Sequence, residues 1–421
     1  MATNVATQPV SPPVPMTFRE VLGITVMRRV WFAQIISLAG DFLALFAVIS
    51  VATYRLHWTP QQVTGIQIAY LLPLALLGPL SGVFVDRWPL KPTLVSSDII
   101  RAFLVLLLLT TTSMWPVFAI LCALSCVSSF FAPAQTVTIR TYVPPTGLIS
   151  ANALMQMGMM GMRIVGPAVA GALVAAFGPH ICYQLDFVSF LASAALIGTV
   201  AIQRPPAPPK AAEASAKGQV YTILRDMSEG MRFIVHHAAI SFVVMAMAAG
   251  MFVIGCFGPL IAIYVRDSLH AKTLTFGFVS ASVGLGMLVG MPVIRRLSGS
   301  VSNSTLVLGG LAGIGLGAAI LGAIPWVGAS MLGCFTIGFT FAGIIVPAQT
   351  LIQRETPNEL MGRISSTMMS SVIFAQLLGL LLSGFLAEMF GVRMVFILCA
   401  VLAWIMTAVG RMMLTDAHAG M

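Results

Sequence analysis

Five ionisable side chains interrupt the long apolar stretches of this sequence: Asp41, Asp98, Arg101, Arg163 and Asp186. A charge at the centre of a bilayer costs about 2.5–3.5 kcal/mol on insertion scales, so such residues usually face a cavity or a charged partner. A carboxyl group taken out of water favours its protonated form and releases the proton when water enters. These residue types therefore indicate proton binding, ion pairing or recognition of a charged ligand.

Asp41 is the first candidate for a proton-coupling carboxylate. It lies about ten residues into the first apolar stretch, which corresponds to about 15 Å along a helix. A structural hydrogen bond is the alternative role. Asp186, near the start of the sixth stretch, is the second candidate. Its alternative is a place near the outer lipid headgroups.

Three further charged residues have two possible roles each. Arg163 is a candidate to bind an anionic substrate, and pairing with an acid on another helix is its alternative role. Asp98 and Arg101 stand three residues apart near one end of the third stretch, and helical side chains at this spacing meet. We expect them to form a structural ion pair, with a gating role as the alternative.

Several chemistries lack the residues that they need. The sequence contains no Gly-Lys-Ser/Thr phosphate loop and no His-Glu-x-x-His pair, and its glycine runs at 284–286 and 309–317 lie inside apolar stretches rather than at a strand-to-helix turn. All six cysteines also fall in apolar stretches, and the six histidines lie in loops or at the ends of stretches. We expect no metal site, no cofactor and no enzymatic activity.

The elements that position the charged residues follow from the composition. Of the 421 residues, 58% are hydrophobic and only 8% are charged, and the mean hydropathy is +0.97. A soluble globular protein carries about 25% charged residues, so the composition predicts a membrane protein surrounded by lipid. The net charge of +9 comes from only 22 Lys and Arg residues, which argues against a nucleic-acid partner.

Twelve stretches are long and apolar enough to cross a bilayer. A spanning helix needs about 20 apolar residues, because lipid offers no partner to backbone polar groups. The sequence therefore predicts an all-α membrane protein with twelve transmembrane helices. The expected spans are Trp31–Tyr54, Val63–Val85, Thr93–Ser113, Trp115–Ile139, Ser150–Phe177, Ile181–Ile202, Ala239–Tyr264, Leu274–Ile294, Thr305–Ala323, Trp326–Thr350, Ser365–Phe390 and Val392–Met413.

One long polar stretch separates the sixth span from the seventh. Residues 203–210 are rich in proline and predict a stiff linker, whereas apolar residues at three-and-four spacing in 218–237 predict an amphipathic surface helix. We expect an N-terminal segment (1–30), a six-helix bundle (31–202), a linker (203–238), a second six-helix bundle (239–413) and a tail (414–421).

Lys and Arg are distributed unevenly between the two sides of the predicted spans. With the N-terminus in the cytoplasm, about 16 of the 22 lie on the cytoplasmic side and about four on the other. An excess of positive charge in cytoplasmic loops sets the orientation of membrane proteins. We therefore expect both termini in the cytoplasm.

An internal repeat relates the two halves of the chain. Pro-Ala-Gln-Thr occurs at 133–136 with Arg140 four residues later, and again at 347–350 with Arg354 at the same distance. A weaker match pairs residues 82–87 with residues 290–295. Both offsets are about half of the chain, which predicts two pseudo-symmetric six-helix bundles arranged as parallel repeats.

The loop between the second and third spans carries a patterned set of charged residues. It contains Gly82, the pair Asp86-Arg87 beginning four residues later, and Lys91. The fifth span has its own pattern of small residues. It contains Gly161, Gly166-Pro167 and Gly171.

Together the two patterns resemble the loop motif and the antiporter-type glycine motif of the major facilitator superfamily, and the resemblance extends over nearly the whole chain. Positions 89, 90 and 170, which are Pro, Leu and Ala, depart from the patterns. Residues 37–41 and 150–154 are similar to the branch that contains enterobactin-type siderophore exporters and macrolide exporters.

The resemblance implies a gate at the cytoplasmic ends of two bundles that rock about a central site. Asp86 near the start of the eleventh helix would gain about 0.3–1 kcal/mol from the helix dipole. Arg87 and Arg140 would add ion pairs. A solvated loop that only sets the orientation is the alternative. The candidate gate residues are Gly82, Asp86, Arg87, Lys91, Asp98, Arg101 and Arg140.

We therefore expect a monomeric secondary active transporter in a bacterial inner membrane. It would export a small amphipathic molecule, drug-like or siderophore-like, by alternating access and in exchange for protons. The alternatives are a flippase for lysophospholipid or another lipid and, after these, an importer. A non-transporting receptor or an intramembrane enzyme would belong to another class, and no motif favours either.

Overall fold

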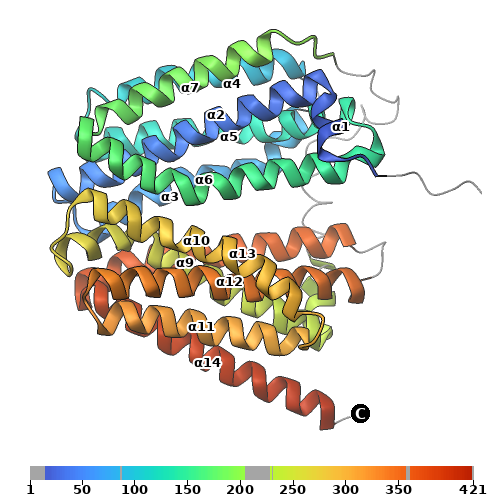
Figure 1. The fold of residues 1–421 in the computed structure, drawn as a ribbon, viewed down its shortest axis with the longest axis vertical. Coiled ribbons are helices and arrows are strands. Elements are labelled where there is room, and N and C mark those ends of the chain that lie inside the picture. Colours follow the sequence, from blue (N-terminus) through green and yellow to red (C-terminus); the bar gives the residue numbers. More distant parts are fainter. Residues whose placement is uncertain (1–14, 86–87, 204–227, 230, 357–360, 420–421) are drawn as a thin grey trace, which may run out of the picture.

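The structure is a computed structural model that describes residues 15–85, 88–203, 228–229, 231–356 and 361–419 (Figure 1). All regular secondary structure in these residues is helical. The helices form two stacked groups, one from each half of the chain, and their long axes run in roughly the same direction. The expected all-α membrane architecture is confirmed.

The first half consists of one short helix and six long ones. Thr17 and Glu20 form a capping box that begins the short helix, and the last long helix begins after Gly178, whose φ of 84° favours glycine. A π-helical turn, Val51–Arg55, extends α2 at its C-terminal end. The helices are α1 (Phe18–Gly23), α2 (Thr25–Ser50), α3 (Pro60–Val85), α4 (Leu90–Leu107), α5 (Met114–Tyr142), α6 (Leu148–Phe177) and α7 (His180–Gly198).

The second half contains six long helices. They are α9 (Ala238–Asp267), α10 (Thr273–Leu297), α11 (Asn303–Ala323), α12 (Val327–Glu355), α13 (Met361–Phe390) and α14 (Val392–Ala419). Most of the predicted linker lies outside the described residues, although residues 231–236 are helical. The repeated Pro-Ala-Gln-Thr segments lie in α5 and α12, the fourth long helix of each half.

Each predicted span corresponds to one long helix. Ten of these helices are long and apolar enough to cross a membrane. The other two are α3 and α4, and α4 carries three charged residues, at 91, 98 and 101, in 18 positions. The chain is therefore a multi-pass membrane protein with ten candidate spans among its described residues.

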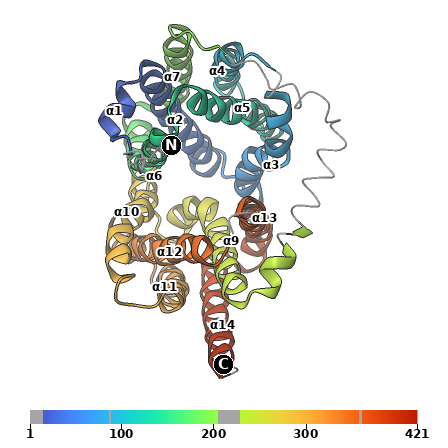
Figure 2. The same cartoon turned by 90° about the vertical axis from the view of Figure 1, so that its right-hand side faces the viewer.

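The two halves pack by the same scheme. In the first half α2 contacts α6 and α7, α3 contacts α5, and α4 contacts α5 and α7. In the second half the equivalent helices make the equivalent pairs. Between the halves, α6 lies beside α10 and α3 lies beside α13 (Figure 2). The pseudo-symmetry expected from the sequence repeat is present in the packing.

Polar contacts between the halves gather at one end of the molecule. Arg266 Nη1 donates a hydrogen bond to the carbonyl oxygen of Thr53 at 2.7 Å. Ser50 Oγ donates to Thr273 Oγ1 at 3.3 Å. All four residues lie at the C-terminal ends of α2 and α9 or at the start of α10. We call this side of the molecule the Arg266 end.

Apolar contacts reinforce the Arg266 end. The rings of Phe46 and Phe276 stack with centroids 4.4 Å apart. At the residue after Phe276, a Cβ atom on Gly277 would lie 2.7 Å from the carbonyl oxygen of Pro167 and 3.1 Å from Gly171 Cα. Because only glycine permits this approach, α6 and α10 meet backbone to backbone between the halves.

The contact between Ser50 and Thr273 can be tested by cross-linking. Cysteines at both positions should form a disulfide under mild oxidation, because the two hydroxyl oxygens that the sulfur atoms would replace lie 3.3 Å apart and small side-chain rotations would bring the sulfur atoms within bonding distance. A protease site inserted between residues 210 and 217 would separate unlinked halves. We expect most of the double variant to remain one band on a non-reducing gel.

The variants that carry only Ser50→Cys or only Thr273→Cys provide the control, and they should separate into halves after cleavage. Separation of the double variant under the same oxidising conditions would show that the two helices do not meet at these residues.

Candidate functional site

The buried guanidinium group of Arg101 lies at the centre of a charged cluster in the first half. It forms an ion pair with Asp98, and its Nη1 lies 3.9 Å from Asp41 Oδ2. The rings of Phe131 and Phe190 each have their centroid 4.5 Å from the guanidinium carbon. A cation between two aromatic faces gains electrostatic energy where water is excluded, so this geometry stabilises a charge inside the membrane.

Asp186 and two serines on α7 complete the cluster. Ser193 Oγ donates to Asp98 Oδ2 at 2.6 Å, and Ser189 Oγ donates to Asp186 Oδ1 at 3.2 Å. Asp186 is buried, and its Oδ1 lies against Gly40, the residue that precedes Asp41 on α2. We call Asp41, Asp98, Arg101 and Asp186, with Ser189 and Ser193, the Arg101 cluster.

Gly40 allows α2 and α7 to approach at the cluster. A Cβ atom on Gly40 would overlap Asp186 Oδ1 and Ser189 Oγ and would lie 2.9 Å from Asp186 Cα. The next residue on α2 is Asp41. The close approach of the two helices therefore brings the carboxyl groups of Asp41 and Asp186 into one site.

The carboxyl groups of the cluster differ in their access to solvent. The Asp41 side chain is 25% exposed, whereas those of Asp98 and Arg101 are 0% and 4% exposed. Asp98 and Asp41 lie within 4 Å of the Arg101 guanidinium group, and Asp186 is buried next to Gly40. With all three carboxyl groups ionised, the cluster would carry excess negative charge in a low dielectric. Asp41 has the most exposed side chain of the ion-paired members of the cluster.

The structure joins residues that the sequence analysis treated separately. The expected pair of Asp98 and Arg101 is present, and Asp41 lies 3.9 Å from the same guanidinium group. Asp186 is buried in the protein. The gating role of the pair and the depth of Asp186 in the bilayer stay predictions. The serines were missed, although Asp186, Ser189 and Ser193 have the i, i+3, i+7 spacing of one helix face.

Arg163 lies away from the cluster, in a cavity between the halves. This cavity has a volume of about 230 Å³. Met251, Phe257 and Phe341 contribute to its apolar lining, while Ser280 and Arg163 contribute polar groups. The Arg163 side chain is exposed, and within the described part of the chain it has no ion pair or hydrogen bond.

The residues proposed for a cytoplasmic gate are only partly described. Asp86 and Arg87 lie outside the described residues. A Cβ atom on Gly82 would have no described atom within 4 Å, and Lys91 and Arg140 form no ion pair with other described residues. The gate therefore remains a prediction from the sequence.

The glycines of the fifth span have different surroundings. Gly171 packs against α10, as described above. A Cβ atom on Gly166 would lie 3.0 Å from Phe42 Cβ, whereas one on Gly161 would have no described atom within 4 Å. Gly166 and Gly171 thus hold α6 against a helix of each half, and Gly161 has no such packing role.

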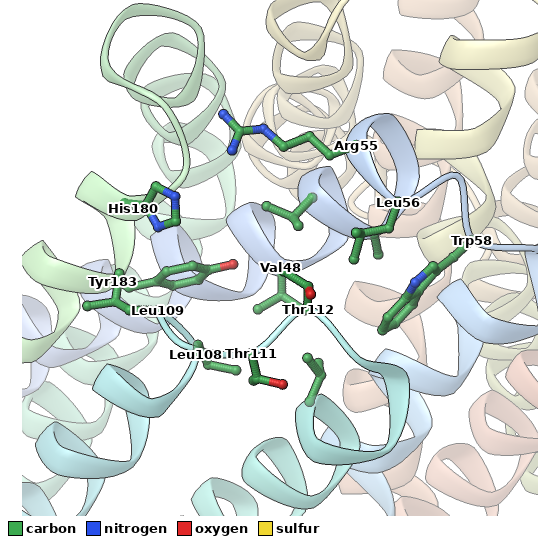
Figure 3. A pocket seen from close by; sticks show the side chains of 13 residues that line it. Val48, Arg55, Leu56, Trp58, Leu108, Leu109, Thr111, Thr112, His180 and Tyr183 are labelled. Carbon is green, nitrogen blue, oxygen red and sulfur yellow. The ribbon is translucent and has the colours of Figure 1, made fainter.

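A smaller pocket of about 130 Å³ lies at the Arg266 end of the first half. Figure 3 shows His180 and Tyr183 on one side of this pocket, Trp58 on the opposite side and Arg55 above it. Its lining comes from the ends of α2 and α7 and from the segment between α4 and α5. The sequence patterns do not indicate this pocket, because its residues come from separate connections.

Comparisons with known proteins bear on this arrangement. A family model described as Major Facilitator Superfamily matches residues 30–372. The MFS-type transporter YfiS of Bacillus subtilis (strain 168) is 27% identical over 404 residues, covering 94% of each chain. Macrolide efflux protein A of Streptococcus pyogenes is 24% identical over 383 residues, covering 89% of this chain and 92% of that protein. The crystal structure of the nucleoside transporter NupG has the same fold, with a TM-score of 0.72 at 13% identity over 92% of this chain and 99% of that chain.

Gly40→Ala should destabilise the protein. The added methyl group would meet Asp186 and Ser189, and overpacking of this kind costs about 1–3 kcal/mol. The expected result is a lower midpoint of thermal unfolding for the purified protein in detergent. Gly161→Ala is the matched control, because its methyl group meets open space and should leave the midpoint unchanged or higher. Equal midpoints for the two variants would contradict the close approach.

Arg101→Gln should be more damaging than the loss of a surface ion pair. It would leave Asp98 buried without its guanidinium partner, and breaking a buried pair costs about 3–5 kcal/mol. Adding Asp98→Asn to Arg101→Gln removes the unpaired carboxylate and should restore part of the stability. Thermal unfolding of the three variants measures the interaction. Additive losses would show that the two residues do not act as a pair.

Proposed function

This chain belongs to the major facilitator superfamily, and from that premise we propose that it exports a small amphipathic molecule by alternating access in exchange for protons. Its relatives include macrolide efflux protein A, which supports the direction of transport. The observation that carries the proposal is the Arg101 cluster, in which carboxyl groups outnumber guanidinium groups inside the membrane.

Asp41 is the proton-binding group in this proposal. Its carboxyl group is partly exposed while its neighbours are buried, so it can exchange protons with water on the open side. Protonation removes one negative charge from a cluster that has one guanidinium group. Asp186 is the second proton site, because its charge interacts with that of Asp41. The charge of the cluster would then differ between the two states of the transport cycle.

In this proposal the contacts between the halves at the Arg266 end close that end of the transport pathway. The structure would then represent the state in which the opposite end is open. The uneven distribution of Lys and Arg supports placing this end outside and both termini in the cytoplasm of a bacterial inner membrane. The present arrangement then corresponds to the state that is open to the cytoplasm. The loop with Gly82, Asp86, Arg87 and Lys91, together with Arg140, would close the opposite end in the other state.

Asp41→Asn should uncouple transport from the proton gradient. In inverted vesicles with an acidic lumen, we expect at least about a tenfold loss of gradient-driven uptake, because asparagine carries no exchangeable acid proton. Exchange of labelled for unlabelled substrate without a gradient should persist. A panel of drugs, siderophores and a labelled lysophospholipid provides the substrates.

Glu355→Gln is the control for this measurement, because Glu355 is exposed at the end of α12, and it should retain gradient-driven uptake. Gradient-driven uptake at the unmodified rate in Asp41→Asn would remove the assignment of the proton site. Movement of the lipid alone would replace export of a soluble molecule by a flippase activity.

A further inference from the structure

The positive charge of Arg163 has no counterion in the described part of the chain. Its guanidinium group lines the cavity between the halves, and neither an ion pair nor a hydrogen bond joins it to another described residue. An ionised side chain inside the bilayer usually faces a partner or a water-filled pathway. The cavity is the place where a partner for this charge can bind.

The second half of the chain offers no acid at the depth of the cavity. Between residues 239 and 413 the sequence contains only Asp267, Glu355, Glu359 and Glu388 as acidic residues. Asp267 and Glu355 are the last residues of α9 and α12, and Glu388 lies in the last turn of α13. Glu359 falls between α12 and α13 in the sequence. None of these positions is in the middle of a span.

The acids of the first half are already engaged. Asp98 pairs with Arg101, and Asp41 lies 3.9 Å from the same guanidinium group. Asp186 accepts a hydrogen bond from Ser189 and is buried between α2 and α7. The Arg101 cluster thus contains every acidic residue that lies inside a span of the first half.

The rest of the cavity determines what kind of anion would fit. Most of its lining is apolar, and the other polar side chains are Ser280 and Gln376. Ser280 Oγ has no hydrogen-bond partner among the described residues. A guanidinium group presents a fixed fork of donors that matches a carboxylate in two parallel hydrogen bonds. The surrounding methionine and phenylalanine side chains would cover an apolar body.

We infer that the transported molecule is an amphipathic anion: one carboxylate-type group bound by Arg163, attached to an apolar body held between α6, α9 and α10. This inference rests on the proposed function, because it identifies the central cavity as the transport site. A cationic drug would place a second positive charge beside an unpaired guanidinium group, so the cavity discriminates against cations.

Three probes with one ring system test the charge preference. They are 1-naphthoate, 1-naphthylmethanol and 1-naphthylmethylamine, which are anionic, neutral and cationic near neutral pH. Calorimetric titration of the full chain in lipid nanodiscs, with empty nanodiscs subtracted, measures their affinities. We expect naphthoate to bind at least about tenfold more tightly than the alcohol or the amine, as charge-assisted hydrogen bonds allow.

Two variants assign the preference to Arg163. Arg163→Gln should reduce the ratio of naphthoate to alcohol affinity to below about threefold, because the charge is lost. Arg163→Lys keeps the charge and should retain most of the preference. Size-exclusion profiles and thermal midpoints of both variants verify that they are folded.

Three results would overturn the inference: no binding of naphthoate at millimolar concentration, equal or tighter binding of the amine, or an unchanged preference in Arg163→Gln. The titrations use no pH gradient, so they give the same answer whether or not Asp41 couples transport to protons. Asp41→Asn should therefore bind naphthoate normally. If the intact chain binds naphthoate as expected but Asp41→Asn keeps its gradient-driven uptake, the proton site is refuted and the inferred substrate class still holds.

Discussion

An ionised group inside a bilayer must be paired or reached by water, and this constraint organises the first half of the protein. Arg101 satisfies it with Asp98, with Asp41 at 3.9 Å and with two aromatic faces. The second half has no acidic residue in the middle of a span, so it needs no comparable cluster. The two bundles share a packing scheme, but the charged chemistry is confined to one of them.

The packing of the first half serves this constraint. The short side chains of Asp41 on α2 and Asp186 on α7 can lie in one cluster because the two helix backbones approach closely. Gly40 permits that approach. The same device joins the two halves, where Gly171 and Gly277 bring α6 against α10. Small residues are common at helix contacts in membranes because lipid provides no hydrophobic driving force between helices. Here the close contact at Gly40 also places Asp186 beside the turn of α2 that carries Asp41.

The sequence was sufficient to predict the helices and the two-bundle arrangement, because the length of apolar stretches and an internal repeat can be read along the chain without knowing how the helices pack. The pairing of Asp98 with Arg101 was equally local. The sequence could not predict that Asp41 and Asp186 lie in one cluster, because this depends on how α2 and α7 are rotated about their axes. The spacing of Asp186, Ser189 and Ser193 was a readable sign of a polar face on α7. Whether Arg163 faced an acid or a cavity required the positions of α9 and α10.

Under the proposed function, α2 and α6 would connect Asp41 to Arg163. Asp41 is followed on α2 by Phe42, whose Cβ would lie 3.0 Å from a methyl group on Gly166. Gly166 is three residues from Arg163 on α6, which is about one helical turn. A change in the charge at Asp41 that shifts α2 would therefore press directly on the turn of α6 that carries Arg163. Because α6 also lies against α10 at Gly171 and Gly277, the same shift would act on the contact between the halves. Under the proposed function, proton binding and substrate binding would then be coupled through one pair of helices, without any contact between the two ligands.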